Sequence, residues 1–256
     1  MNKIYKIINL KKKKPIVCLT AYSKPFAKIL DNYCDIVLVG DSLATAMLGM
    51  KSTHHINVDT MIRHGISVKS NLNKAVCVID MPANSYKNIK QAKKNAKLIV
   101  KKTKCDAVKV ECNGKNYHII KSIVDSGIPV MGHIGYTPQH LKNFKVQGVL
   151  EKDRYELLKQ ADRNQKAGVF SIVLECINAL TSKEITETLK IPTIGIGAST
   201  YCDGQILVTD DMLGLSGFYP KFVKKFARLS NIIVKGVQKY NKDVLTKKFP
   251  SKKNNF

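Results

Sequence analysis

Eight apolar runs in this 256-residue chain end on polar side chains or glycine, and their ends include acids and a histidine that could do chemistry. In order, the runs end at Thr20, Asp41, Asp80, Glu111, His133, Glu175, Gly197 and Asp210. An apolar run that stops on a carboxylate is typical of a parallel barrel strand whose last side chain reaches the catalytic mouth. Several such carboxylates beside a histidine indicate a site that binds a metal ion and moves protons.

Asp41 and Asp80 end the second and third runs, so in a barrel they would be neighbours at the mouth. Two converging carboxylates repel each other unless a cation or a proton lies between them. Their hard oxygen ligands suit Mg²⁺, which keeps room in its shell for water and substrate. The alternative is that one of the two aspartates only caps the helix that follows it.

Lys109 and Glu111 are two residues apart in the fourth run, so their side chains point to the same face. Both would be costly to bury without a partner, so we expect each to pair with the other, a metal ion or an anionic ligand. Glu111 could reach the ion through water, while Lys109 could neutralise a substrate carboxylate. An ordinary internal salt bridge is the alternative.

Glu175 and His133 end two further runs. The neighbours of Glu175 are apolar, and burial raises the pKa of a carboxyl group toward neutrality, as a general base requires. A metal ion facing it could polarise a carbonyl oxygen and acidify the adjacent C–H, which indicates enolisation of a 2-keto acid followed by attack on an electrophile. A lone histidine is structural as readily as catalytic. Beyond it, Thr137-Pro138 is typical of a helix start.

Amphipathic stretches alternate with the apolar runs. They cover residues 24–33, 57–72, 88–103, 115–127, 151–168 and 182–190. Strands alternating with helices predict parallel βα units, and eight such units in a chain of this length predict a closed (β/α)8 barrel. An open, doubly wound sheet is the alternative, but its first loop is usually glycine-rich, and TAYSKPFA is not. We expect one domain over 1–256, with a loosely held tail from about residue 242.

The formal charge of +24 comes almost entirely from lysine, because only four of the 43 basic residues are arginine. A basic nucleic-acid-binding protein is an alternative interpretation of this charge. However, nucleic-acid sites favour arginine, and this alternative also leaves the buried carboxylates unexplained. The seven cysteines form no C-x-x-C pair, which favours reduced, buried thiols in a cytoplasmic protein. No apolar run is long enough to cross a membrane, and no secretory signal is recognisable.

A set of motifs along the chain resembles the ketopantoate hydroxymethyltransferase family. They are LTAYSKPFAKILD, LVGDSLATAMLGMKST, VIDMP, VKVE, PVMGHIGYTPQ, KVQG, LEC, IPTIGIGA, DGQILV and PKFVKKF, from about residue 15 to 226. The resemblance implies a (β/α)8 barrel that transfers a one-carbon unit from 5,10-methylenetetrahydrofolate to 3-methyl-2-oxobutanoate, giving 2-dehydropantoate for pantothenate synthesis. It also implies a homodecamer, which this charge would strain unless the lysines face outward.

Residue roles follow from the same resemblance, motif by motif. Asp41 and Asp80 would ligate Mg²⁺, and Glu111 would complete its shell. The residues that would contact the keto acid are Asp41, Ser42, Asp80 and Lys109, with His133 lining the pocket. Glu175 would accept the C3 proton. Thr20, Gly197 and Asp210 are then expected to be architectural.

The chain departs from the family pattern at loops expected to lie at the mouth. Cys112-Asn113 replaces small residues, the loop HLKNFKVQG is shortened, and GIGAS replaces the commoner GIGAG. We expect these changes to affect folate binding and turnover more than the reaction type. A metal-dependent carbon–carbon or phosphorus–carbon lyase on a related barrel is a further alternative, but such enzymes use a cysteine-bearing mobile loop, whereas KTKCDAV precedes a predicted strand.

Overall fold

The computed structural model describes residues 3–141, 143–217 and 219–255. The chain forms two compact units, Met1–Val208 and Thr209–Phe256. The first unit contains the whole sheet and every residue predicted to do chemistry. The second contains short helices and one long helix.

The first unit is a closed barrel in which eight parallel strands pair in chain order, β1 to β8. The strands are β1 (Ile16–Thr20), β2 (Ile36–Val39), β3 (Val76–Asp80), β4 (Ala107–Glu111), β5 (Val130–Gly135), β6 (Ser171–Glu175), β7 (Thr193–Ile196) and β8 (Gly204–Leu207). Every one lies within or overlaps a predicted apolar run. The predicted barrel and its strand order are therefore confirmed.

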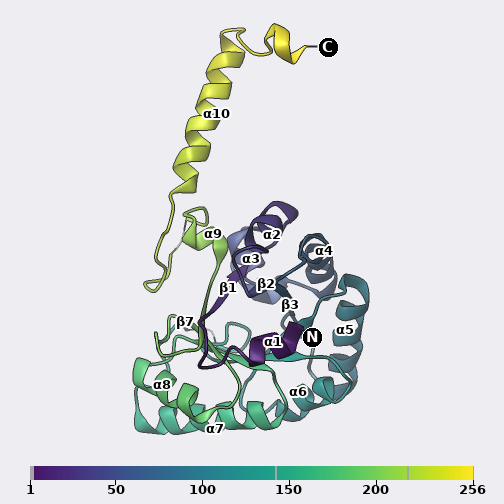
Figure 1. The fold of residues 1–256 in the computed structure, drawn as a ribbon, viewed down its shortest axis with the longest axis vertical. Helices are drawn as coiled ribbons and strands as arrows, with labels where there is room; N and C mark the ends of the chain where they lie inside the picture. Colours follow the sequence, from purple (N-terminus) through teal and green to yellow (C-terminus); the bar gives the residue numbers. More distant parts are fainter. Residues whose placement is uncertain (1–2, 142, 218, 256) are drawn as a thin grey trace. The chain divides into compact units, whose positions relative to one another are not determined.

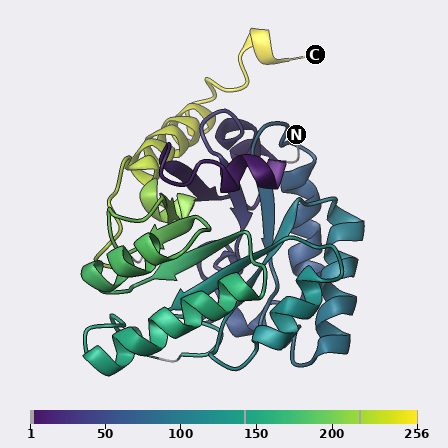
Figure 2. The ribbon, with the colours of Figure 1, turned by 60° about the horizontal axis from the view of Figure 1, so that its bottom comes forward.

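Helices wrap the outside of these strands, as Figures 1 and 2 show. They are α2 (Lys24–Leu30), α3 (Leu43–Ala46), α4 (Val58–Lys69), α5 (Ile89–Thr103), α6 (Tyr117–Val124), α7 (Glu151–Lys166) and α8 (Ala179–Thr188), with a 3-10 turn at Thr53–His55. Asn57, Asn88 and Asn178 begin α4, α5 and α8, and each side chain accepts a hydrogen bond from a main-chain N–H of the first turn. These caps fix where the helices start after the preceding loops.

The helix start expected at Thr137-Pro138 is wrong. The segment forms a turn in which the main-chain N–H groups of His140 and Leu141 donate to the carbonyl of Thr137. The next helix, α7, begins only at Glu151. A Thr-Pro pair suits a turn as well as a helix, and here no apolar helical repeat follows to extend it.

Alternating side chains along each strand pack into two separate apolar clusters. In β3, for example, Val76 and Val78 belong to an inward-facing cluster, whereas Ile79 belongs to the cluster packed against the surrounding helices. This period of two follows from the pleat of a strand. The residue that ends a strand therefore points into the barrel whenever it is in phase with the inward set.

A short N-terminal helix, α1 (Lys3–Ile8), joins the inward-facing cluster. Ile4 and Ile7 are 6% and 3% exposed and pack with residues from the beginnings of the strands. Lys3 donates from Nζ to the carbonyl of Ala75 over 3.1 Å. The helix thus plugs the end of the barrel opposite the predicted mouth. This helix was not predicted from the sequence, although Ile4 and Ile7 have helical spacing.

Asp203, just before β8, ties this plug to the barrel. Its carboxylate accepts from Lys11 Nζ over 2.7 Å and from the main-chain N–H of Thr193 over 2.9 Å. The side chains of Lys11 and Asp203 are 9% and 5% exposed. A shielded ion pair between residues 192 apart in the chain therefore closes the base.

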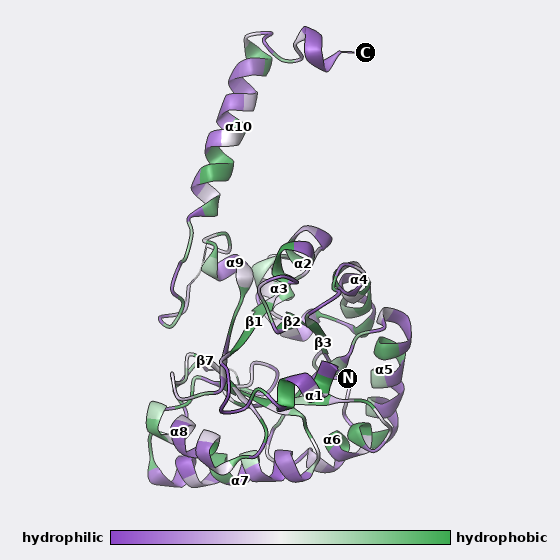
Figure 3. Ribbon diagram, in the orientation of Figure 1, coloured by the Kyte–Doolittle hydropathy of each residue, from purple (hydrophilic) through white to green (hydrophobic). Residues whose placement is uncertain are grey.

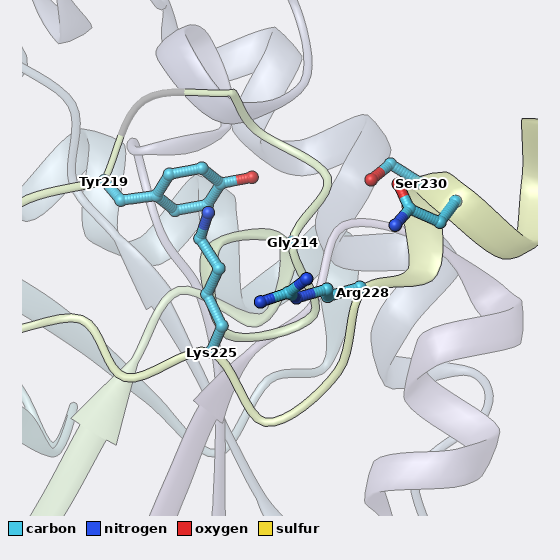
Figure 4. Close-up of a pocket in the computed structure, with 6 residues that line it drawn as sticks. Gly214, Tyr219, Lys225, Arg228 and Ser230 are labelled. Carbon is cyan, nitrogen blue, oxygen red and sulfur yellow. The ribbon is translucent and has the colours of Figure 1, made fainter.

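The second unit contains α9 (Thr209–Met212), α10 (Leu229–Leu245) and a 3-10 turn at Lys252–Asn254. The tail expected from about residue 242 thus starts within α10, and its looseness stays a prediction. None of the residues of α10 is buried, and apolar and polar stretches both lie on its surface (Figure 3). A cavity of roughly 290 Å³ lies within this unit, where Lys225 Nζ is 3.4 Å from the centre of the Tyr219 ring, beside Arg228 (Figure 4).

All seven cysteines are buried and none forms a disulfide. Burial raises the pKa of each thiol, to about 11 for Cys34 and Cys105. The expected burial of these thiols is confirmed, and buried cysteine behaves as a small hydrophobic residue. Among the described residues, no helix is long and apolar enough to cross a membrane.

Candidate active site

The predicted chemistry-bearing side chains meet inside the barrel at the carboxyl ends of its strands. Asp80 and Glu111 are the last residues of β3 and β4, and Glu175 is the last of β6. Lys109 lies two residues after Ala107 in β4, and His133 lies two residues after Met131 in β5. Both side chains therefore point into the barrel, as those apolar residues do. The pleat therefore accounts for their convergence, because each sits an even number of residues from an inward-facing apolar position.

Asp41, Asp80 and Lys109 form the tightest part of the site. Asp41 follows β2, and its main-chain N–H donates to Asp80 Oδ2 over 3.0 Å. Lys109 Nζ donates to Asp80 Oδ1, also over 3.0 Å. The three residues are 5%, 2% and 6% exposed. The pairing expected of Lys109 is thus made with Asp80 and not with its strand neighbour Glu111.

Burial governs the electrostatics of these groups. It raises the pKa of Asp41 to about 7, and the charge of Asp80 adds to that shift, while Lys109 and Gln139 oppose it. Burial and the charge of Asp41 likewise raise the pKa of Glu111 well above its usual value. For Lys109, burial disfavours the charged form, but the three carboxylates outweigh it and raise its pKa. One buried ammonium group therefore balances the charge of three nearby carboxyl groups only in part.

This donor set fits a divalent cation. Buried carboxylates that raise one another's pKa are groups that an added positive charge would stabilise. Mg²⁺ is commonly held by only one or two carboxylates plus water and substrate oxygens. Within residues 3–141, 143–217 and 219–255, no three His, Cys, Asp or Glu side chains form a ready-made ligand set. A cation at this place would need water and substrate oxygens to complete its shell, and the metal assignment stays a prediction.

Glu175 lies on the other side of the mouth, next to His133. Burial raises its pKa to about 8, Lys109 lowers it and Asp80 raises it. The sequence-based expectation of a raised pKa for this carboxyl group agrees with its surroundings. A carboxyl group that titrates near neutral pH can accept a proton from a weakly acidic C–H.

His133 lies between two glutamates. Its Nε2 is 3.2 Å from Glu175 Oε2, and its Nδ1 is 3.6 Å from Glu111 Oε1. These distances would suit ion pairs, yet burial and the charge of Lys109 lower the pKa of His133 well below its usual value. We regard the ring as neutral, because it is 2% exposed and faces a buried cation. Neither ring nitrogen has a well-formed hydrogen bond with the described residues, although each faces a glutamate carboxylate.

Ser42 follows Asp41 at the same strand end. Its hydroxyl lies 2.9 Å from the hydroxyl of Tyr22, which comes from the loop after β1. The serine is half-buried, so a small ligand at the mouth could reach it. Thr20 ends β1 and is buried, Gly197 follows β7, and Asp210 lies in α9 of the second unit.

Two further residues belong to the site, and sequence reasoning missed both. Gln139, in the turn after β5, hydrogen-bonds Asp41 and Glu111, and Tyr86, in the loop after β3, hydrogen-bonds Gln139. Gln139 is the last residue of GHIGYTPQ. A sequence signal for Gln139 was present. A polar residue in the loop after a barrel strand lies at the same mouth as the acids that end the other strands, so it could have been considered as a hydrogen-bond partner for them.

A glycine permits the close approach of β5 and β6 beside the base. Gly135 has φ of +95°, and a side chain there would collide with the main-chain carbonyl of Glu175. The same carbonyl accepts from the main-chain N–H of Tyr136 over 2.8 Å. This bond fixes the backbone from which the Glu175 side chain projects.

The sequence model that describes ketopantoate hydroxymethyltransferase matches residues 2–252. The chain belongs to the ketopantoate hydroxymethyltransferase family. A relative from Pelagibacter ubique, named 3-methyl-2-oxobutanoate hydroxymethyltransferase, is 48% identical over 254 residues, which are 99% of each chain. One of the same name from Thermosipho africanus is 46% identical over 99% of this chain and 97% of its own. The expected family is confirmed.

Solved structures of low sequence identity share the fold with this member of the ketopantoate hydroxymethyltransferase family. A phosphonopyruvate hydrolase in complex with oxalate and Mg²⁺ is 10% identical with a TM-score of 0.63, covering 99% of this chain and 93% of that one. A 2,3-dimethylmalate lyase is 11% identical with a TM-score of 0.63, covering 95% and 87%. At these identities the likeness concerns the barrel alone.

Proposed function

We propose that this protein is a 3-methyl-2-oxobutanoate hydroxymethyltransferase that uses 5,10-methylenetetrahydrofolate as its one-carbon donor and forms 2-dehydropantoate. Membership of the family supports the reaction class. The observation that carries the proposal is Glu175, a partly buried carboxyl group whose pKa is raised to about 8, in the same mouth as the Asp41–Asp80–Lys109 cluster. A base and an anion-stabilising cluster at one end of the barrel are what enolisation of a keto acid needs.

Asp41 and Asp80 would hold one Mg²⁺, with Glu111 completing its shell through water. When bound, the cation would polarise the keto oxygen and so acidify the adjacent C3–H. Glu175 takes that proton at its carboxylate, and the ammonium of Lys109 offsets the charge of the substrate carboxylate. Ser42 supplies a hydroxyl to the keto acid. Neutral His133 lines the pocket and can donate or accept a hydrogen bond without adding charge.

The enolate carbon then attacks the one-carbon unit of the folate. The methylene carbon is bonded to two folate nitrogens, and both of these bonds break while one carbon–carbon bond forms and water supplies the hydroxyl oxygen. The proton taken from C3 and the second proton of that water go to the two nitrogens, so tetrahydrofolate and 2-dehydropantoate leave. Burial of the site protects the enolate from reprotonation by bulk water.

The first half of this reaction can be tested without folate. We expect Mg²⁺-dependent exchange of the C3 proton of 3-methyl-2-oxobutanoate into D₂O, followed by ¹H NMR, and loss of that exchange in Glu175→Gln. Glu184→Gln is the matched control, because Glu184 pairs with Arg154 on the helical shell. Exchange retained in Glu175→Gln would remove that residue from the base role, and absence of 2-dehydropantoate when folate is added would overturn the transferase.

The lyase alternative places its catalytic cysteine in a loop at the mouth. Cys105 instead precedes β4, at the opposite end of that strand from Glu111, and it is buried. Burial raises its pKa to about 11, which disfavours a reactive thiolate. The transferase is therefore the better reading of this site.

We further propose that the protein works in the cytoplasm as a homodecamer, as the family resemblance implies. Sedimentation of the purified full chain measures the assembly directly. A monomer or dimer at micromolar concentration in 0.15 M salt would contradict the decamer.

A further inference from the structure

Gln139 contacts the ends of three strands other than its own. Its side-chain Nε2 donates to Asp41 Oδ2 over 2.8 Å, after β2, and to the carbonyl of Met81 over 3.1 Å, after β3. Its main-chain N–H donates to Glu111 Oε2 over 2.9 Å, at the end of β4. The residue is 7% exposed. A single buried residue in the turn after β5 thus links Asp41, through its side chain, to Glu111, through its main chain.

We propose that Gln139 is a positioning residue, which holds Asp41 in the orientation that receives the divalent cation. This inference rests on the proposed function, because it assumes that Asp41 is a ligand. Gln139 itself touches neither substrate nor metal in this scheme. It acts through the carboxylate that it holds.

Tyr86 determines which way the amide of Gln139 faces. The tyrosine hydroxyl donates to Gln139 Oε1, so the oxygen of the amide is engaged and the nitrogen faces Asp41. Tyr86 is 6% exposed, and burial together with the charge of Glu111 raises its pKa well above the usual value. It therefore stays a phenol and a donor at every pH where the enzyme works.

A neutral donor is the suitable partner for Asp41. Asp80 already has a cationic partner, Lys109, whose ammonium would compete with a metal ion for the same oxygens. Gln139 fixes one oxygen of Asp41 without adding charge. Gln139 engages Oδ2, so Oδ1 is the oxygen that we expect to meet the cation. Partners of this kind orient ligands, and their loss commonly lowers metal affinity about 10- to 100-fold.

The test is Gln139→Met, which keeps the side-chain length and removes all three side-chain hydrogen bonds, to Asp41, to the carbonyl of Met81 and from Tyr86. The main-chain bond to Glu111 survives, so Asp41 is the only carboxylate that loses a partner. We expect the Kd for Mg²⁺, measured by titration calorimetry on the full chain without substrate, to rise about 10- to 100-fold. Gln165→Met is the matched control: it also removes a side-chain hydrogen bond, to the main chain of Lys190, and its Kd should equal that of the wild type.

A second variant and a second measurement distinguish a positioning effect from misfolding of the site. Tyr86→Phe leaves Gln139 in place but frees its amide, so its Kd should rise by less. The kcat of Gln139→Met should recover at saturating Mg²⁺, because positioning affects occupancy of the site; a collapsed site would not recover.

Unchanged or tighter Mg²⁺ binding in Gln139→Met overturns the inference while leaving the proposed function standing. So does a kcat that stays low at saturating Mg²⁺. If the wild type itself binds no Mg²⁺, the metal assignment fails, and the inference fails with it.

Discussion

The main-chain N–H of Asp41 donates to the side chain of Asp80 over 3.0 Å. One acid of the cluster is therefore held by the backbone of the other, and the spacing of the pair is set by two strand ends. Lys109 engages the remaining oxygen of Asp80, so this carboxylate is neutralised by the protein itself. Burial and the charge of Asp80 raise the pKa of Asp41 to about 7, and Lys109 and the hydrogen bond from Gln139 offset only part of that shift.

Removal of the buried ammonium should destabilise the barrel. In Lys109→Met the nearby carboxylates lose their counter-charge, and an uncompensated buried charge costs about 3 kcal/mol or more. The cost should be largest at pH 8, where the carboxylates are charged, and should shrink toward pH 5 as they take up protons. Urea unfolding at both pH values measures it. Lys121→Met, which loses an exposed pair with Asp125, should stay within about 0.5 kcal/mol; equal losses in both variants would contradict the account.

The charged form of Glu175 should lower the free energy of unfolding at high pH. Its folded pKa of about 8 lies above the unfolded value, so its protonated form is favoured on folding, and stability is lost as pH rises through 8. Without metal, Glu175→Gln should be more stable than the wild type at pH 9, by a free energy of unfolding on the order of a few kcal/mol, and should therefore melt at a higher temperature. Near pH 4.5 the two proteins should melt at similar temperatures. Parallel melting curves across this range would show that Glu175 is solvated in the folded protein.

The same group should shape the pH dependence of enolisation. A general base works only when deprotonated, so the exchange rate should fall as pH drops through the pKa of Glu175. We expect that acid limb well above 4.5, displaced toward 8, because burial disfavours the carboxylate. The measurement is C3 exchange between pH 5 and 9.5. A rate that is flat from pH 5.5 upward would contradict the raised pKa.

His133 should remain neutral from pH 6 to 8. Burial and the charge of Lys109 both lower its pKa well below 6.5, despite the glutamates nearby. Nitrogen NMR of the imidazole should show one protonated and one bare ring nitrogen throughout this range. Exposed His118 serves as the internal control. A His133 resonance that titrates near 6.5 would mean that the ring pairs with Glu175 as a cation.

The sequence predicted the barrel well because each strand is a self-contained signal. Runs such as VCVID and AVKVE are short, apolar and β-branched, and the period of two then assigns Asp80, Lys109 and Glu111 to one interior. Family membership is likewise confirmed. The metal and catalytic roles stay predictions, since they concern molecules that bind to the chain.

Gln139 and helix α1 show what the sequence could not reveal as readily. Gln139 lies in a turn, and the Thr-Pro pair that begins this turn is also common at helix starts. Whether its amide meets Asp41, 98 residues earlier, depends on the closure of the whole barrel. The α1 helix has only six residues, so basic flanks obscured its apolar spacing.

The plug formed by α1 has a consequence for how the protein is made. Lys11 leaves the ribosome early, whereas its partner Asp203 follows 192 residues later. The apolar face of α1 can be covered fully only once β8 has been synthesised and has paired with β1. Contacts this distant in sequence slow folding and leave apolar surface exposed meanwhile. Synthesis of nearly the whole first unit must therefore be complete before the barrel can seal, which makes the nascent chain a natural client for chaperones.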